Sequence, residues 1–219
     1  MRNRFDMQLE NLSTQLILMG NLCEKAITNV AKALKNGDLE LAKQAIRDDE
    51  EIDQMEKEIE SMCLKLLLQQ QPVARDLRQI SAALKMITDM ERIGDQTADI
   101  ADIIISAGMS EVSDIDAILE MAEGTSQMVH DSVMAYVTKN LELARKVMMA
   151  DDKVDDLFDL MKENLVKIIA DDHGNQGGKA IDIMMITKYL ERIGDHATNI
   201  AEWVEFSITG VHKDSQKIE

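Results

Sequence analysis

The chain is poor in aromatic residues, proline and glycine, and it has no long apolar run. Aromatic side chains make up 3% of its 219 residues, with 1 proline and 10 glycines. This composition disfavours an all-β fold, which depends on aromatic and β-branched strands, and favours Leu, Ile, Met and Ala packed between helices. No segment approaches the roughly 18 consecutive apolar residues of a membrane span.

Basic residues and cysteines are also scarce. The chain has 24 Lys and Arg against 41 Asp and Glu, a formal net charge of −17. This balance argues against nucleic-acid binding and favours cations or basic protein surfaces as partners. Cys23 and Cys63 are the only cysteines and form no CxxC motif, so we expect core residues in a reducing compartment. The N-terminal MRNRFDMQLEN is not typical of a signal peptide.

Helical periodicity dominates what is present. In the first segment apolar residues step by four and three, at Phe5, Leu9, Leu12, Leu16, Met19, Cys23, Ala26, Val30 and Ala33. This heptad pattern predicts a long helix in a left-handed bundle. Asn36-Gly37 should end it, Asp38 should cap the next helix, and that helix should end before Gln71-Pro72. Further helices are predicted over about 75–105, 114–137, 140–171 and 179–208, the last preceded by the turn HGNQGG (173–178).

The two halves of the chain are copies of each other. LELAK at Leu39 matches LELAR at Leu141, and ERIGD occurs at both Glu91 and Glu191. Collinear matches of this length predict a tandem repeat. The expected fold is therefore all-α, with two tandem three-helix bundles, six long helices and a pseudo-two-fold repeat. The units should span residues 1–107 and 108–219 and pack as one body.

Acidic residues recur at helical spacing in the first half. Asp49 and Asp53 form one i,i+4 pair, Glu91 and Asp95 form another, and Asp99 extends the second. Such neighbours lie about 5–6 Å apart, and like charges there are destabilising unless a cation lies between them. An antiparallel hairpin about residues 72–73 places Asp53 opposite about residue 92 and Asp49 opposite about residue 96. The turn at 36–37 should also bring Glu24 to Asp49.

The second half repeats this pattern. A turn near residues 174–175 should bring Asp151 and Asp155 to Glu191 and Asp195. Asn199 replaces Asp99 there as a weaker ligand, and a serine, Ser126, stands where the first half has Glu24. The repeat therefore predicts two sites that are not identical.

Two interpretations of these acids differ in kind. One is a solvated acidic face, and the other is a pair of metal sites. All-oxygen ligands suit hard cations such as Mg, Ca, Mn or iron, and the number of carboxylates favours a polynuclear cluster. A carboxylate-bridged iron enzyme or iron store is an alternative, although no Glu-x-x-His motif of such bundles occurs. A third possibility is a structural bundle that docks on a coiled-coil partner through its 16 methionines.

Other residues of the ERIGD motifs are expected to support these sites. Gly94 and Gly194 each cost about 1 kcal/mol relative to Ala inside a helix. Ordinary close packing would explain them, and so would a missing side chain that lets the neighbouring helix approach and tightens the acidic cluster. Arg92 and Arg192 should pair with carboxylates of the bundle rather than bind phosphate. His196 lies off the acidic stripe and is not expected to be a ligand.

The motifs together resemble those of the PhoU family of phosphate-signalling regulators. The resemblance rests on the doubled ERIGD, on QPVARDLR (71–78), on MGNLCE (19–24) and on the paired D-x-x-x-D motifs, and it covers about residues 5–208. It implies metal binding by E/D-x-x-x-D motifs, with iron favoured over manganese or magnesium. The implied ligands are Asp49, Asp53, Glu91, Asp95, Asp99, Asp151, Asp155, Glu191 and Asp195.

The same resemblance implies a role. Family members are expected to be cytoplasmic, non-enzymatic negative regulators of phosphate uptake and signalling. They would bridge an ABC-type phosphate transporter and a phosphate-sensing histidine kinase, reach the membrane only through these partners, and in some cases form homodimers.

Overall fold

The part of the chain that the structure describes folds into helices. The computed structural model describes residues 2–69, 72–109, 115–171 and 173–212. These residues form α1 (Arg2–Asn36), α2 (Leu39–Gln69), α3 (Ala74–Ala107), α4 (Ile115–Thr138), α5 (Leu141–Asp171) and α6 (Gly177–Thr209), with no strand among them. The predicted all-α class with six long helices is confirmed. No helix within these ranges has the length and apolar character of a membrane span.

The helix ends follow the predicted signals closely. The Asp38 carboxylate accepts hydrogen bonds from the backbone N–H of Glu40 at 3.0 Å and of Leu41 at 3.3 Å, so it caps α2 as expected. The end of α2 at Gln69 agrees with the prediction, while Gln70 and Gln71 lie outside the described residues. The predicted turn over 173–178 is too long, because α6 already begins at Gly177.

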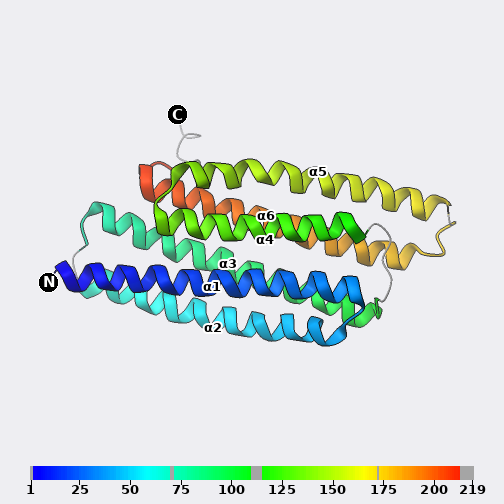
Figure 1. The fold of residues 1–219 in the computed structure, drawn as a ribbon, viewed down its shortest axis with the longest axis horizontal. Helices are drawn as coiled ribbons and strands as arrows, with labels where there is room; N and C mark the ends of the chain where they lie inside the picture. Colours follow the sequence, from blue (N-terminus) through cyan, green and yellow to red (C-terminus); the bar gives the residue numbers. More distant parts are fainter. Residues whose placement is uncertain (1, 70–71, 110–114, 172, 213–219) are drawn as a thin grey trace.

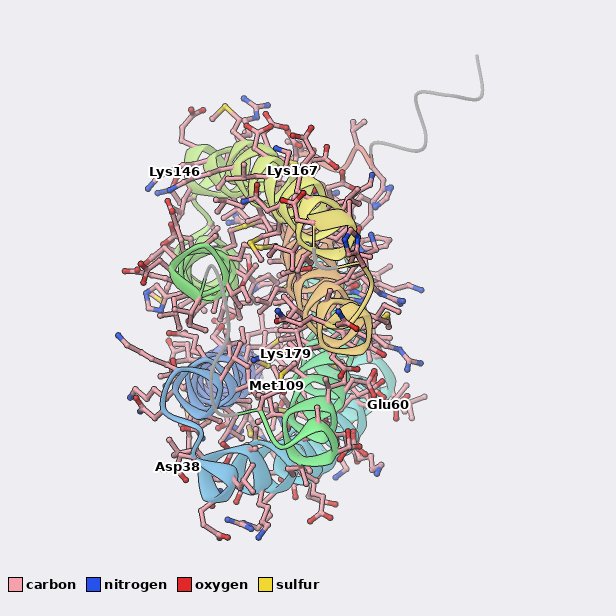
Figure 2. The ribbon with its side chains drawn as sticks, turned by 90° about the vertical axis from the view of Figure 1, so that its right-hand side faces the viewer. Asp38, Glu60, Met109, Lys146, Lys167 and Lys179 are labelled. Carbon is pink, nitrogen blue, oxygen red and sulfur yellow. The ribbon has the colours of Figure 1, made fainter. Side chains whose placement is uncertain are left out.

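The six helices form two three-helix bundles that share an interface. α1, α2 and α3 pack together, α4, α5 and α6 pack together, α3 packs on α6, and α1 packs on α4. Figure 1 shows that α3 and α6 run in opposite directions, as do α1 and α4. Viewed along the helices, α2 and α5 lie on the outside, and α3 and α6 lie between them (Figure 2). The α2–α3 and α5–α6 pairs therefore flank the α3–α6 contact.

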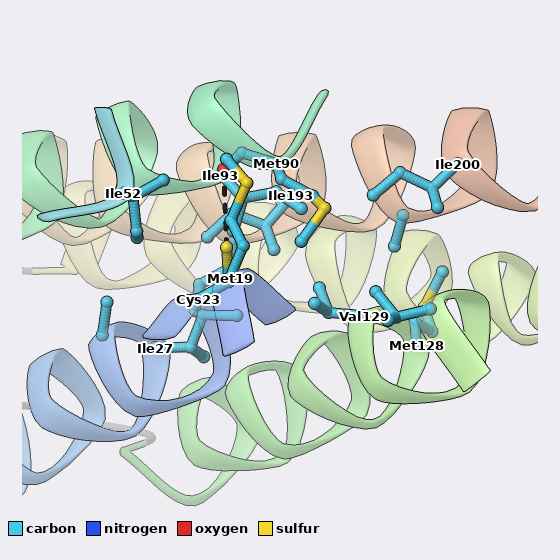
Figure 3. Packing of buried hydrophobic residues seen from close by; sticks show 14 of the residues in the cluster. Met19, Cys23, Ile27, Ile52, Met90, Ile93, Met128, Val129, Ile193 and Ile200 are labelled. Carbon is cyan, nitrogen blue, oxygen red and sulfur yellow. Dashed lines mark hydrogen bonds between the residues drawn. The ribbon is translucent and has the colours of Figure 1, made fainter. Parts of the chain in front are cut away.

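A continuous apolar core runs through both bundles. The predicted α1 stripe is buried except for Leu9, which is partly buried. The buried residues of α3 include six that step by four and three along one face: Met86, Met90, Ile93, Thr97, Ile100 and Ile104. Figure 3 shows Ile93 and Ile193 from the two repeats beside Met19 and Cys23 of α1.

Both cysteines are free and buried, as predicted. The Cys23 thiol donates to the Met90 carbonyl at 3.5 Å (Figure 3). Burial raises the pKa of both thiols, that of Cys63 to about 12, so they act as small apolar core residues and not as nucleophiles.

Candidate metal sites on the acidic helix pairs

The first acidic site lies between α2 and α3. α2 contributes Asp49 and Asp53, and α3 contributes Glu91 and Asp95, each pair one helical turn apart. A methyl group in place of the Gly94 hydrogen would lie 2.5 Å from Oδ1 of Asp49. The carboxylate therefore rests directly on the α3 backbone, in a space that only glycine leaves open. The turn at residues 72–73 predicts that Asp49 lies opposite about residue 96, and its contact with Gly94 is close to this register.

Negative charge accumulates at this site without full compensation. Burial, followed by the charges of Asp53, Asp95 and Glu91, raises the pKa of Asp49 to about 6. Burial and the charge of Asp95 also raise the pKa of Glu91, and Arg92 opposes this. Oδ1 of Asp49 is buried and accepts no hydrogen bond from the described residues. Oε2 of Glu91 is likewise without a hydrogen bond, although Nε of Arg92 lies 3.4 Å away.

The second site, between α5 and α6, repeats this geometry. A methyl group on Gly194 would lie 3.0 Å from Oδ1 of Asp151, and this oxygen also is buried and has no hydrogen-bond partner in the described part of the chain. Burial, followed by the charges of Asp155 and Asp195, raises the pKa of Asp151 to about 6, and the nearby Thr198 hydroxyl opposes this rise. Burial raises the pKa of Asp155 and of Asp195 as well, each with the charge of Glu191 as the next cause. The structure thus brings together the same carboxylates in both repeats.

The two sites differ at positions that the sequence analysis did not single out. In the second site, Nζ of Lys188 lies 2.5 Å from Oε2 of Glu191, while the first repeat has Thr88 at the corresponding place. In the first site Glu56 adds a further acid, whose pKa is raised by burial and by the charges of Glu60 and Asp53. The sequence could have predicted the place of Glu56, since it follows Asp53 by three residues and therefore lies on the same helix face.

Asp99 lies at the edge of the first site, where α3 meets α6. Burial raises its pKa, whereas the Tyr189 hydroxyl and the charge of Arg192, both from α6, lower it. Asp99 also contributes to the raised pKa of Asp49. Arg192 therefore acts on a carboxylate of the other repeat, and Asp99 joins the first acidic site to the second bundle.

Asn199 also faces the other repeat. Its Nδ2 donates to Oδ1 of Asp89 at 3.2 Å, and Nδ1 of His196 lies 2.9 Å from the same oxygen. The antiparallel packing of α3 on α6 explains both contacts. His196 is thus engaged with Asp89, in agreement with its predicted place off the acidic stripe.

The predicted partner is confirmed for Arg92 but not for Glu24. Nη1 of Arg92 lies 2.7 Å from Oδ2 of Asp95, which confirms the expected pairing with a bundle carboxylate. Glu24 does not join the first site, so that expectation is wrong. Its Oε1 lies 3.1 Å from Nδ1 of His130, because this side of α1 faces α4.

The residues present fit a hard cation by their chemistry. Each site offers four carboxylates, and its most buried one has an oxygen without a hydrogen bond. Oxygen ligands of this kind suit iron, manganese, magnesium and calcium. Within the described ranges, however, no three His, Cys, Asp or Glu side chains are placed to hold one ion. The helices therefore gather the ligands, and the side chains would have to turn to close around an ion.

Known proteins resemble this chain over nearly its whole length. A family profile described as PhoU domain matches residues 16–104 and 118–204. A phosphate-specific transport system accessory protein PhoU homolog of Clostridium acetobutylicum is 38% identical over 215 residues, covering 97% of this chain and 98% of the relative. A homolog of the same name from Aquifex aeolicus is 35% identical over 186 residues, or 84% of each chain.

Solved structures show the same fold. The crystal structure of PhoU from Pseudomonas aeruginosa superposes with a TM-score of 0.88 at 32% identity, covering 94% of this chain and 100% of the other. The phosphate transport system regulatory protein PhoU from Streptococcus pneumoniae superposes with a TM-score of 0.86 at 24% identity, covering 95% and 98%. The second likeness concerns the fold alone.

Proposed function

This chain belongs to the PhoU family, and we propose that it is an accessory protein that restrains phosphate uptake and phosphate-responsive signalling. The relatives are named as accessory proteins of the phosphate-specific transport system. The chain is accordingly a regulator and not an enzyme. The comparisons give no support to the alternative of a carboxylate-bridged iron enzyme.

The observation that carries the metal-binding part of the proposal is a half-buried carboxylate that occurs at the corresponding place in each repeat. Asp49 and Asp151 each rest on a helix glycine, with a raised pKa and an oxygen that accepts no hydrogen bond. A desolvated carboxylate without a hydrogen bond lowers the stability of the folded protein, and a bound cation would compensate its charge. Metal ions, with iron favoured over manganese and magnesium, would be held in polynuclear form.

The ligands of the first metal site would be Asp49, Asp53, Glu91 and Asp95, with Asp99 at its edge. Those of the second would be Asp151, Asp155, Glu191 and Asp195, with Asn199 at the corresponding edge. Bound ions supply positive charge to an otherwise acidic surface. In this proposal the surface docks on an ABC-type phosphate transporter and a phosphate-sensing histidine kinase in the cytoplasm, with the chain as a monomer or a homodimer.

Elemental analysis of the purified protein tests the metal sites. The chelator-treated wild type should take up iron or manganese, and the double variant Asp95→Ala/Asp195→Ala should lose most of this uptake. The matched control is Glu40→Ala/Glu142→Ala, which removes one exposed acid from the first turn of α2 and of α5. The metal proposal fails if the wild type takes up neither ion.

Phosphate uptake by cells tests the regulatory role. Cells that lack the protein should take up phosphate faster, and the wild-type gene should restore restraint. A gene with Asp95→Ala/Asp195→Ala should not, while the control pair should. If both variants restrain uptake equally, the acidic sites have no part in the regulation.

A further inference from the structure

A basic cavity lies at one end of the molecule, away from both acidic sites. It has a volume of about 300 Å³ between the start of α3 and the ends of α4 and α6, and its lining includes Arg75, Arg78, Gln79, Tyr136, Lys139 and Ser207. Arg78 precedes Gly94 by 16 residues on α3, which corresponds to about 24 Å along a helix. In a chain with a formal charge of −17, no described acidic residue lines this cavity.

The three basic side chains have no partner within the described part of the protein. Arg75, Arg78 and Lys139 form neither an ion pair nor a side-chain hydrogen bond there. Nε of Arg78 is buried without an acceptor. A methyl group on Gly210 would lie 3.6 Å from Cδ, Nε and Cζ of Arg78, so the end of α6 packs against the guanidinium group. Buried donors without acceptors are rare in proteins and call for an explanation.

A purely structural role for these bases explains less. Cations near a helix C-terminus are stabilised by the helix dipole, and Arg78 lies at the end of α6. Among the described residues, however, no backbone carbonyl accepts a hydrogen bond from it. The corresponding end of the second repeat has Asn175 and Gly178 in place of the two arginines. The helical hairpin therefore forms without them.

Lys139 gives an independent indication. It has φ +54° at the end of α4, where the first repeat has Gly37 with φ +65°. A non-glycine residue in this left-handed region costs roughly 1 kcal/mol relative to glycine. The second repeat thus keeps a lysine at a position where the first repeat shows that glycine is the relaxed choice.

The remaining polar groups define the chemistry of the cavity. The Tyr136 hydroxyl donates to the Gln79 carbonyl at 2.9 Å, and the Ser207 hydroxyl donates to the Val204 carbonyl at 2.7 Å. Their protons are therefore committed to the protein. The donors left for a ligand are the two guanidinium groups, the Lys139 ammonium and the Gln79 side-chain amide, and three of these four groups carry positive charge.

We propose that this cavity binds a dianionic phosphate group, either as free phosphate or as a phosphate monoester. Guanidinium forks match the geometry of phosphate oxygens, and three positive charges suit a dianion. A volume of about 300 Å³ is at the small end of ligand pockets. The inference goes beyond the proposed function, because this site requires no metal ion.

Calorimetric titration of the chelator-treated full chain with inorganic phosphate, and separately with a nucleoside monophosphate, tests the proposal. We expect at least one of these two ligands to bind saturably, with one molecule per chain. The ligand that binds more tightly identifies the source of the phosphate group. Arg75→Ala should weaken binding roughly tenfold or more. Lys179→Ala, which removes an exposed lysine at the far end of α6, should leave it unchanged.

Lys139→Gly is the most informative variant. It should weaken phosphate binding roughly tenfold while keeping or raising the melting temperature, since it copies the relaxed backbone of the first repeat. A loss of binding would then not reflect unfolding. The proposal is overturned if the metal-free wild type binds neither ligand, or if Arg75→Ala and Lys139→Gly bind as tightly as the wild type. Binding that appears only after iron or manganese is restored would also overturn it, and would place phosphate on the metal sites.

Discussion

Replacing Asp49 by asparagine should stabilise the metal-free protein at neutral pH. The pKa of Asp49 rises from 3.8 to about 6 on folding, which corresponds to about 3 kcal/mol at 1.36 kcal/mol per pH unit. Because the carboxylate is only half-buried, solvent screening reduces this to about 1 kcal/mol. For a chain of this size that is a rise of about 2–4 °C in melting temperature.

The pH dependence has a definite sign. The folded state binds the Asp49 proton more tightly than the unfolded chain does, so the stabilising contribution is complete below pH 3.8 and is lost as pH rises through about 6. The Asp49→Asn variant lacks this loss. Its advantage over the wild type should therefore be present at pH 7 and absent near pH 3.8. Asp151→Asn should behave in the same way, since the pKa of Asp151 is also raised to about 6.

The neighbouring residue supplies the control. Asp48 is fully buried, and its carboxylate accepts hydrogen bonds from Lys25 at 2.6 Å, Asn29 at 2.8 Å and Gln44 at 2.8 Å. Asp48→Asn should destabilise the protein by about 2 kcal/mol, because it removes hydrogen bonds to a charged group.

Thermal denaturation of chelator-treated protein at both pH values measures these effects. With added metal the wild type should have the higher melting temperature, since only the wild type gains the stabilisation that metal binding provides. The reasoning is refuted if Asp49→Asn lowers the melting temperature at pH 7 without metal, or if its effect is the same at both pH values.

Further expectations concern the glycines, the second site and the interface between the repeats. Gly94→Ala should abolish metal uptake at the first site, measured by elemental analysis, because its methyl group would lie 2.5 Å from the facing α2 carboxylate. Gly124→Ala meets only one side-chain atom, at 3.8 Å, and should raise the free energy of unfolding by about 1 kcal/mol in thermal denaturation. Lys188→Thr should tighten metal binding at the second site in calorimetry, because it frees the Glu191 carboxylate; equal affinity would contradict the charge argument. Asp89→Ala should cost about 1–2 kcal/mol in urea denaturation, because it removes two contacts between α3 and α6.

The α2–α3 site was predictable because its geometry is local. Spacing of four residues places Asp49 and Asp53 on one face of a helix, and a short turn fixes the register of the next helix against it. The approach of Asp49 to Gly94 follows from these two facts. The same reasoning was wrong for Glu24. The turn at residues 36–37 sets the height of Glu24 along the bundle, but it does not set the direction in which the side chain points. That direction depends on α4, which offers His130.

The sequence by itself determined the helices, the cap at Asp38, the tandem repeat and the pairing of acids within each hairpin, since each of these depends on residues close in the chain. Only the tertiary structure decided how one repeat lies on the other. The antiparallel contact of α3 with α6 brings Asp99 to Tyr189 and Asn199 to Asp89. The packing of α3, α4 and α6 also gathers Arg75, Arg78 and Lys139 around one cavity. Periodicity states which side chains share a stripe, but which stripes meet is settled by the packing of whole helices.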